Sequence, residues 1–183
     1  ASSLGLAVFC ASMLFWSLSG YGPPKGPSMS LASPLKGGTF YVANGGYSIL
    51  INPHMKTLVR ESLSGYRAQS YALDMVRIDR FGRRAEGLWP EDLRRYHIFG
   101  EPVYAPCTGV VAQIEDQLPD QDPPQADRRH PAGNFVRLEC GEADVLLAHL
   151  MHSSLTVGSW QRVQTGQLIG RVGNSGLSME PHL

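Results

Sequence analysis

Frequent glycine and proline residues predict many turns rather than long helices in this chain, and this feature limits the possible folds most strongly. The chain has 183 residues, of which 20 are glycine and 13 are proline, and such a composition is typical of many turns. Four short β-prone runs follow one another in the second half, at residues 109–114, 134–139, 145–148 and 168–172. We therefore predict a mainly β chain that is large enough for one ordinary domain.

The first half gives a weaker pattern of the same kind. Residues 39–42 and 48–51 are further β-prone runs, and residues 71–79 alternate apolar and other side chains as a half-buried strand does. Helix-compatible character is confined to residues 90–96, where a proline is followed by two acidic residues. Residues 116–131 are rich in proline and acidic side chains and are most simply a solvated surface loop.

The N-terminal stretch differs from everything that follows it. Residues 1–24 contain no charged side chain, and residues 4–18 are almost wholly apolar. This length suits a signal-peptide core or a membrane anchor. The third possible interpretation of the segment is a buried helix of a soluble domain. We expect an N-terminal apolar helix that is a signal peptide or membrane anchor over residues 1–20, a linker over residues 21–35, and a folded domain over residues 36–183. The folded domain would then be extracytoplasmic, either secreted or anchored at the cell envelope.

Charge and cysteine usage narrow the possible partners. The chain has 16 basic and 16 acidic residues and no net charge, so no nucleic-acid partner is expected. Cys10 lies in the apolar stretch, whereas Cys107 and Cys140 lie in the folded part. An antiparallel register that opposes Gln113 to Asn134 also opposes the two late cysteines. We therefore predict a Cys107–Cys140 disulfide, although the exact register is open.

Six short motifs follow one another in a fixed order through the rest of the chain. They occupy residues 72–74, 102–111, 133–136, 147–150, 163–170 and 173–183. Together they closely resemble the lysostaphin/LytM-type zinc metallopeptidases, which are peptidoglycan endopeptidases. The resemblance implies packed antiparallel sheets with a groove across them, of the duplicated-hybrid-motif type, and peptides of peptidoglycan as the substrate.

The resemblance also implies a Zn²⁺ cofactor and assigns roles to particular residues. Asp74 matches a zinc ligand, His149 matches a catalytic histidine that precedes leucine, and His182 matches the first histidine of a His-x-His motif. Two imidazoles and a carboxylate can hold zinc with one position open for water, whose pKa then falls toward ~7. The other two histidines can take the proton and stabilise the oxyanion.

The sequence departs from the family pattern in two places. Ser70 stands four residues before Asp74, where the family has a ligand histidine, and His54 in an Asn-x-His motif is the candidate replacement. The third ligand would follow Leu183, so we expect the chain to be truncated at its C-terminus within the peptidase domain.

Each candidate residue also has a structural interpretation. Asp74 can be a surface carboxylate, His149 a core histidine, and His182 a turn residue. His152 would face away from His149 on a strand, and His97 and His130 receive no role. Four arginines are most simply solvated, or else grip an anionic wall polymer; they are Arg83, Arg84, Arg94 and Arg95.

Two functions remain open at this point. The first is a zinc-dependent endopeptidase that hydrolyses peptide bonds in peptidoglycan. The second is a catalytically inactive relative that binds wall peptide or activates another wall hydrolase, and Ser70 favours it. A lipoyl or biotinyl carrier is disfavoured because no lysine follows Lys56.

Overall fold

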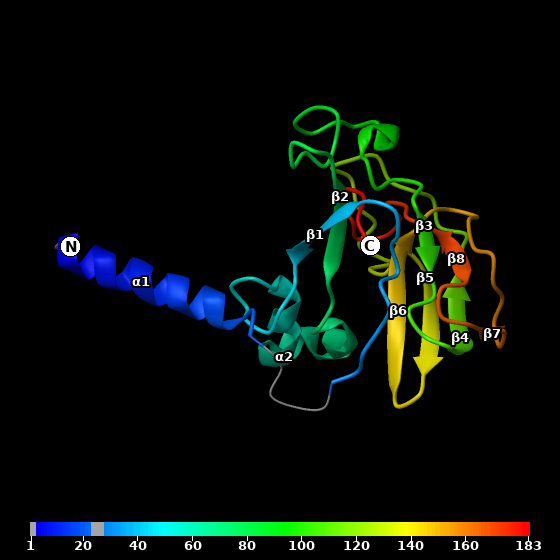
Figure 1. Cartoon of the computed structure of the whole chain (residues 1–183), viewed down its shortest axis with the longest axis horizontal. Coiled ribbons are helices and arrows are strands. Elements are labelled where there is room, and N and C mark those ends of the chain that lie inside the picture. Colours follow the sequence, from blue (N-terminus) through cyan, green and yellow to red (C-terminus); the bar gives the residue numbers. More distant parts are fainter. Residues whose placement is uncertain (1–2, 23–27) are drawn as a thin grey trace. The chain divides into compact units, whose positions relative to one another are not determined.

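The computed structural model describes residues 3–22 and 28–183 (Figure 1). The chain divides into two compact units. Unit 1 consists of Ala1–Met29 and Val42–Asp74, and unit 2 consists of Ser30–Tyr41 and Met75–Leu183. Residues 1–2 of the expected anchor and residues 23–27 of the expected linker lie outside the described residues.

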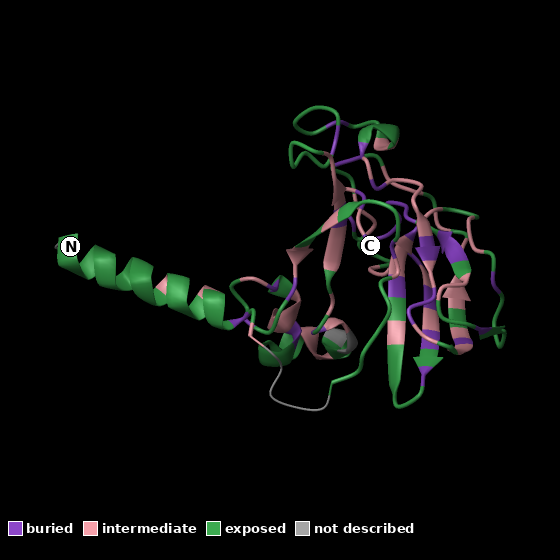
Figure 2. Cartoon of the chain, in the orientation of Figure 1, coloured by how far each residue is buried: buried purple, intermediate pink, exposed green. Residues whose placement is uncertain are grey.

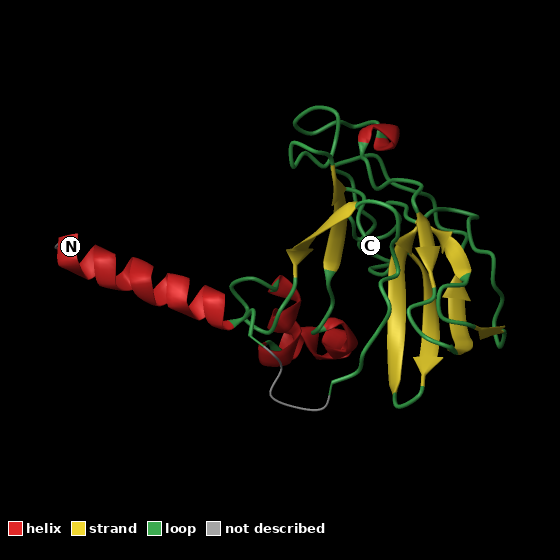
Figure 3. Ribbon diagram, viewed as in Figure 1, coloured by secondary structure: helices red, strands yellow, loops and turns green. Residues whose placement is uncertain are grey.

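Unit 2 is built on antiparallel sheets, as the sequence predicts (Figure 3). Its strands are β3 (Pro102–Tyr104), β4 (Gly109–Glu115), β5 (Asn134–Cys140), β6 (Ala143–Leu150), β7 (Arg162–Val163) and β8 (Leu168–Arg171). Four of them form one sheet in the order β6-β5-β4-β7, and β3 pairs with β8 in a second, two-stranded sheet. A short 3₁₀ helix, η3 (Leu93–Arg95), lies in the region where the sequence is helix-compatible.

The core of unit 2 follows from the alternation of side chains along its strands. In β5 every second residue is buried, beginning at Asn134 and ending at Cys140 (Figure 2). Val136 and Leu138 are fully buried with Val103 of β3 and Ile169 of β8. Each such aliphatic side chain contributes about 1.5–3 kcal/mol on transfer from water. The apolar alternation therefore selects which face of the sheet is covered.

Strands β1 (Thr39–Asn44) and β2 (Asp74–Ile78) form a further two-stranded sheet. The helices of unit 1 are α1 (Ser3–Ser19), η1 (Pro53–Met55), α2 (Lys56–Val59) and η2 (Glu61–Gln69). The predicted strand at residues 48–51 is wrong, because this segment turns instead: the carbonyl of Ser48 accepts the backbone N–H groups of Ile51 and Asn52. Asn52 then caps η1, and Pro53 begins it.

The predicted disulfide between Cys107 and Cys140 is confirmed, with Cα atoms 5.9 Å apart. The register used to place it is wrong. Gln113 opposes Arg137 and not Asn134, and the register shifts between Val111 and Gln113. Cys107 precedes the first residue of β4, so its reach to Cys140 is not set by the ladder. A bulge of this kind leaves no clear mark on the hydrophobic pattern.

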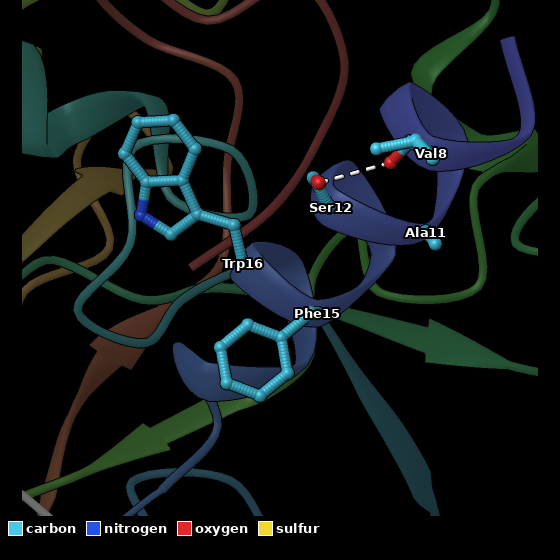
Figure 4. Close-up of a pocket in the computed structure, with 5 residues that line it drawn as sticks. All are labelled: Val8, Ala11, Ser12, Phe15 and Trp16. Atoms are coloured by element: carbon cyan, nitrogen blue, oxygen red, sulfur yellow. Dashed lines mark hydrogen bonds between the residues drawn. The ribbon is translucent and has the colours of Figure 1, made fainter. Parts of the chain in front are cut away.

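Helix α1 exposes its apolar side chains on all sides and buries none of them (Figure 2). A shallow pocket on it is lined by Val8, Ala11, Ser12, Phe15 and Trp16 (Figure 4). The hydroxyl of Ser12 is bound to the carbonyl of Val8, one turn earlier, at 2.9 Å. The described part of the chain contains no helix whose length and hydropathy together allow it to span a membrane.

Candidate active site

Unit 1 brings two of the predicted site residues together. Nε2 of His54 lies 2.9 Å from Oδ1 of Asp74. The other carboxylate oxygen, Oδ2, accepts a hydrogen bond from the side chain of Asn44 at 2.7 Å. The side chains of His54 and Asp74 are 28% and 18% exposed, so the pair remains within reach of solvent. The carboxylate is thus oriented by two partners from different parts of unit 1.

His54 is placed by the buried side chain of Asn52. The side-chain nitrogen of Asn52 donates to the carbonyls of Gly46 and Ala72, at 2.9 and 3.2 Å. The side-chain oxygen of Asn52 accepts the backbone N–H of His54. One side chain therefore joins the segment that carries His54 to the segment that leads into Asp74. The hydrogen bond that Asp74 accepts from His54 raises the pKa of His54 above its ordinary value, against the opposing effect of burial.

Ser70 is fully buried and has a structural role in unit 1. Its hydroxyl lies 2.6 Å from the hydroxyl of Thr57 and 2.6 Å from the carbonyl of Arg67. Thr57 in turn donates to the carbonyl of His54 at 2.7 Å. The residue found where the family has a ligand histidine therefore supports, through Thr57, the turn that carries His54.

Unit 2 brings the other two predicted residues together. The rings of His149 and His182 lie 4.7 Å apart between centroids and are tilted by 53°. Nδ1 of His149 is 2.9 Å from the carbonyl of Ser175, and Nδ1 of His182 is 2.9 Å from the carbonyl of Glu180. A carbonyl oxygen only accepts, so Nδ1 carries the proton in both rings. In the neutral rings, Nε2 is then the basic nitrogen.

His149 reaches this position through an unusual backbone conformation. Its φ is +57°, and the pairing of β5 with β6 shifts register between Asn134 and Val136. The N–H of His149 bonds to the carbonyl of Ala132, and its own carbonyl accepts the N–H of Gly173. A left-handed residue at a bulge redirects its side chain relative to a regular strand.

The histidines without an assigned role lie elsewhere. The strand placement of His152 is wrong, because it follows β6 in a turn and its N–H bonds to Asp120. Nε2 of His97 is 4.0 Å from a carboxylate oxygen of Asp79. His130 contacts Asp127 at 2.7 Å, and this hydrogen bond is the main reason why the pKa of Asp127 falls to about 2.

The acidic, proline-rich loop at residues 116–131 is attached to the segment beneath His149. Asp120 accepts the N–H of Asn174 at 2.6 Å, and the N–H of Asp127 bonds to the carbonyl of Gly176 at 2.7 Å. Ser175 lies between these two anchored residues. The loop therefore holds the carbonyl that fixes the tautomer of His149.

Sequence reasoning missed the groups that orient the four predicted residues. Asn44 is the last residue of β1 and stands directly before a glycine pair. This pair was the only sequence feature that marked the position of Asn44. The carbonyls of Ser175 and Glu180 belong to the last motif, but a backbone group gives no residue-type signal at all. Such partners become visible only when the chain is folded.

The donor chemistry of His54 and Asp74 fits a zinc ion in part. An imidazole nitrogen and a carboxylate oxygen are ordinary zinc ligands, and here they already lie next to each other. Three protein ligands are usual at a catalytic zinc ion. Within residues 3–22 and 28–183, no group of three or more His, Cys, Asp or Glu side chains is arranged to hold a metal.

Comparison with known proteins gives a family match and several structural neighbours. The model of peptidase family M23 matches residues 95–183. A candidate M23 peptidase from Pseudomonas aeruginosa is 17% identical, with 96% of this chain and 51% of that chain covered and a TM-score of 0.45. A zinc-containing peptidase from Vibrio cholerae is 22% identical, with 57% and 33% covered and a TM-score of 0.36. The chain thus spans about half and about a third of the lengths of these two proteins.

The catalytic domain of the antimicrobial peptidase lysostaphin from Staphylococcus simulans is 23% identical. The alignment covers 54% of this chain and 71% of that domain, with a TM-score of 0.34. The comparison with curated proteins finds no match. The family match includes both histidines of unit 2 and the carbonyls that bind them. Over residues 95–183 the chain therefore resembles peptidase family M23.

Proposed function

We propose that this protein is a zinc-dependent endopeptidase that hydrolyses peptide bonds in bacterial peptidoglycan. The observation that carries the proposal is the contact between Nε2 of His54 and Oδ1 of Asp74. It puts a second zinc-type donor beside the ligand aspartate, although Ser70 replaces the usual histidine. His54 and Asp74 would hold the metal, which when bound would supply Lewis acidity and an activated water.

His149 and His182 would carry the proton chemistry. Each has Nδ1–H committed to a backbone carbonyl, so Nε2 is the ring nitrogen that would accept a proton. A ring that has taken up this proton becomes a donor at both nitrogens. It can then stabilise the negative charge that develops on the oxygen of the scissile amide.

The third ligand in this proposal is a residue placed after Leu183. The N–H of Met75 bonds to the carbonyl of Leu183 at 2.8 Å, and the N–H of Leu183 bonds to the carbonyl of Met75 at 3.1 Å. Met75 directly follows Asp74. In an antiparallel pair, a residue added after Leu183 would oppose Asp74. We propose that a histidine at this position completes the site.

Metal analysis of two engineered forms tests the ligand set. A single histidine added after Leu183 should raise zinc binding to about one ion per chain, whereas an added alanine should leave it weak. In the histidine-extended form, Asp74→Ala and His54→Ala should each remove most of the zinc. If the extended form with both residues intact holds no zinc, the proposed site is wrong.

Hydrolysis separates the metal ligands from the proton carriers. In the histidine-extended form, His149→Ala should keep the zinc but lower the release of peptide from peptidoglycan by about 10²–10⁴-fold. His152→Ala is the matched control, because His152 lies three residues later, in the turn that follows β6. Equal losses in both variants would contradict the role proposed for His149.

The alternative is a catalytically inactive relative that binds wall peptide or activates another wall hydrolase. The buried, hydrogen-bonded position of Ser70 favours it, since this residue is not a zinc ligand. This function predicts that the chain co-sediments with peptidoglycan without releasing peptide and without zinc. It also predicts that His149→Ala leaves this binding unchanged.

We also propose that the folded part is extracytoplasmic and that residues 1–20 associate with a lipid membrane, with residues 21–35 as a linker. Two observations support this. The Cys107–Cys140 disulfide suits an oxidising compartment, and α1 is uncharged and exposes apolar side chains on all sides. Peptidoglycan lies in the same compartment.

A further inference from the structure

The carbonyl that binds His182 lies only two residues before it in the chain. Glu180 O is 2.9 Å from Nδ1 of His182 and 2.8 Å from the hydroxyl of Ser178. Ser178 is buried, and its hydroxyl also lies 2.7 Å from the side-chain oxygen of Asn174. Nδ1 of His182 also lies 3.2 Å from the Ser178 hydroxyl, so the Glu180 carbonyl is the nearer of two groups that hold this nitrogen.

The side chain of Glu180 is held from another part of unit 2. Nη1 of Arg84 lies 2.7 Å from Oε1 of Glu180, and the two side chains are 43% and 21% exposed. Arg84 belongs to residues 79–97, which we call the arm. The segment that carries His182 is also held through Leu183, whose backbone pairs with that of Met75, and through contacts with the loop at residues 116–131.

The arm holds Arg84 on a firm base. The N–H of His97 bonds to the carbonyl of Arg84 at 3.0 Å, and the N–H of Glu86 bonds to the carbonyl of Arg95 at 2.8 Å. Between them Ala85 pairs with Tyr96. These contacts place Arg84 in the part of the arm where its two segments pair.

A buried tyrosine, Tyr96, lies in the neighbourhood of this ion pair. Tyr96 is 3% exposed, and no hydrogen-bond partner for its hydroxyl lies in the part of the chain that the structure describes. Burial is the main cause that raises the pKa of Tyr96, the charge of Glu180 raises it further, and Arg84 opposes both. The Tyr96 hydroxyl is therefore near enough to both side chains for their charges to act on it.

We propose that Arg84 is a positioning residue for His182. Its ion pair with Glu180 fixes the carbonyl that holds Nδ1–H of His182, so Arg84 sets which nitrogen of that ring is basic. The effect of Arg84 on catalysis rests on the proposed function. Its effect on the tautomer of His182 does not, because the ring has a preferred tautomer whether or not the protein hydrolyses a substrate.

Imidazole ¹⁵N NMR of the intact chain at a pH where the rings are neutral tests the proposal directly. Arg84→Met keeps the length of the side chain but removes its charge, and it should shift part of the His182 population to the Nε2–H tautomer. The expected change in the tautomer ratio is about two- to fivefold, the range of a partly exposed ion pair. Arg84→Lys should restore most of the original ratio.

Two controls distinguish a specific effect on His182 from a general loss of structure. Arg83→Met removes the neighbouring arginine, which pairs with Asp79 within the arm, and should leave His182 unchanged. His149, which is bound to Ser175, should keep its tautomer in every variant. An unchanged His182 spectrum in Arg84→Met, with His149 also native-like, would overturn the proposal.

Kinetics provides a second readout if the histidine-extended form is active. Arg84→Met should lower kcat about two- to fivefold with little change in KM, since Arg84 acts through His182 and not on the substrate. A larger change in KM than in kcat would instead assign Arg84 to substrate binding. If no form hydrolyses peptidoglycan, the proposed function fails while the tautomer measurement still decides the role of Arg84.

Discussion

At the scale of single residues, the candidate site combines a strained histidine with side chains that are firmly held. His149 has a positive φ, which costs a residue other than glycine about 1–2 kcal/mol. The conformation persists because backbone hydrogen bonds to Ala132 and Gly173 fix both sides of the peptide. Strain that is kept at a chemically active residue indicates that side-chain direction has been selected over stability.

Substitution at His149 should therefore separate strain from chemistry. His149→Gly should leave the free energy of unfolding unchanged or slightly higher, whereas His149→Val should lower it by about 1–2 kcal/mol, because a β-branched residue resists positive φ. Urea denaturation monitored by fluorescence measures both. Equal destabilisation by glycine and valine would show that the ring packing of His149 matters more than its backbone.

Asp127 provides a pH dependence with a definite sign. Hydrogen bonds from His130 and from the backbone of Arg129 lower the pKa of Asp127 from 3.8 to about 2. A carboxyl group with a lowered pKa stabilises the folded state above pH 3.8, and this contribution is lost as the pH falls through about 2.

The difference in unfolding free energy between the native chain and Asp127→Asn should follow this curve. It should be constant above about pH 5 and shrink steadily toward pH 2. Urea titrations at several pH values measure it. Asp122→Asn in the same loop is the control, and a difference that stays constant down to pH 2 would contradict the lowered pKa of Asp127.

At the scale of elements, the site depends on a close crossing of two backbones. Gly133 and Gly176 both have positive φ, and a Cβ added to either would collide with the backbone of the other segment. Ser175 lies at this crossing and carries the carbonyl that binds His149. Only residues without a side chain allow the two segments to approach so closely.

Two glycine substitutions isolate the effect of this crossing. Gly141 also has a positive φ, but no atom lies within 4 Å of its added Cβ, so Gly141→Ala should cost only about 1 kcal/mol of unfolding free energy. Gly176→Ala carries the same backbone penalty plus overpacking, and should cost about 1–3 kcal/mol more. It should also disturb the ¹⁵N signals of His149. Equal costs for the two variants would mean that the crossing can relax freely.

The sequence predicted β4, β5, β6 and β8 well because each is a short apolar run between turns, whereas the shorter strands β3 and β7 were not predicted. It failed for residues 53–69, whose helical turns lack a clear apolar period and are begun by the local cap of Asn52 and Pro53. It also failed for the register of β4 with β5, because the shift after Val111 is invisible in the pattern. The candidate residues were found by motif resemblance, whereas the carbonyls that orient them depend on tertiary contacts.

At the scale of the whole molecule, the two units divide the candidate residues between them. His54 and Asp74 belong to unit 1, and His149 and His182 belong to unit 2. Each pair is organised by its own network, through Asn52 and Asn44 in one case and through Ser175 and Glu180 in the other. Substitutions in one network should therefore be tested for effects on its own pair first.

The apolar helix α1 gives the last prediction, which concerns the proposed association with lipid. The intact chain should float with vesicles of phosphatidylcholine and phosphatidylglycerol, since α1 exposes apolar side chains on every side. Val8→Lys puts a charge in the middle of the helix and should weaken vesicle binding on the order of 100-fold. Leu88→Lys is the matched control, because this substitution adds the same charge at a fully exposed position on the arm. Vesicle binding that is equal in the two lysine variants would show that α1 is not the segment that enters the lipid.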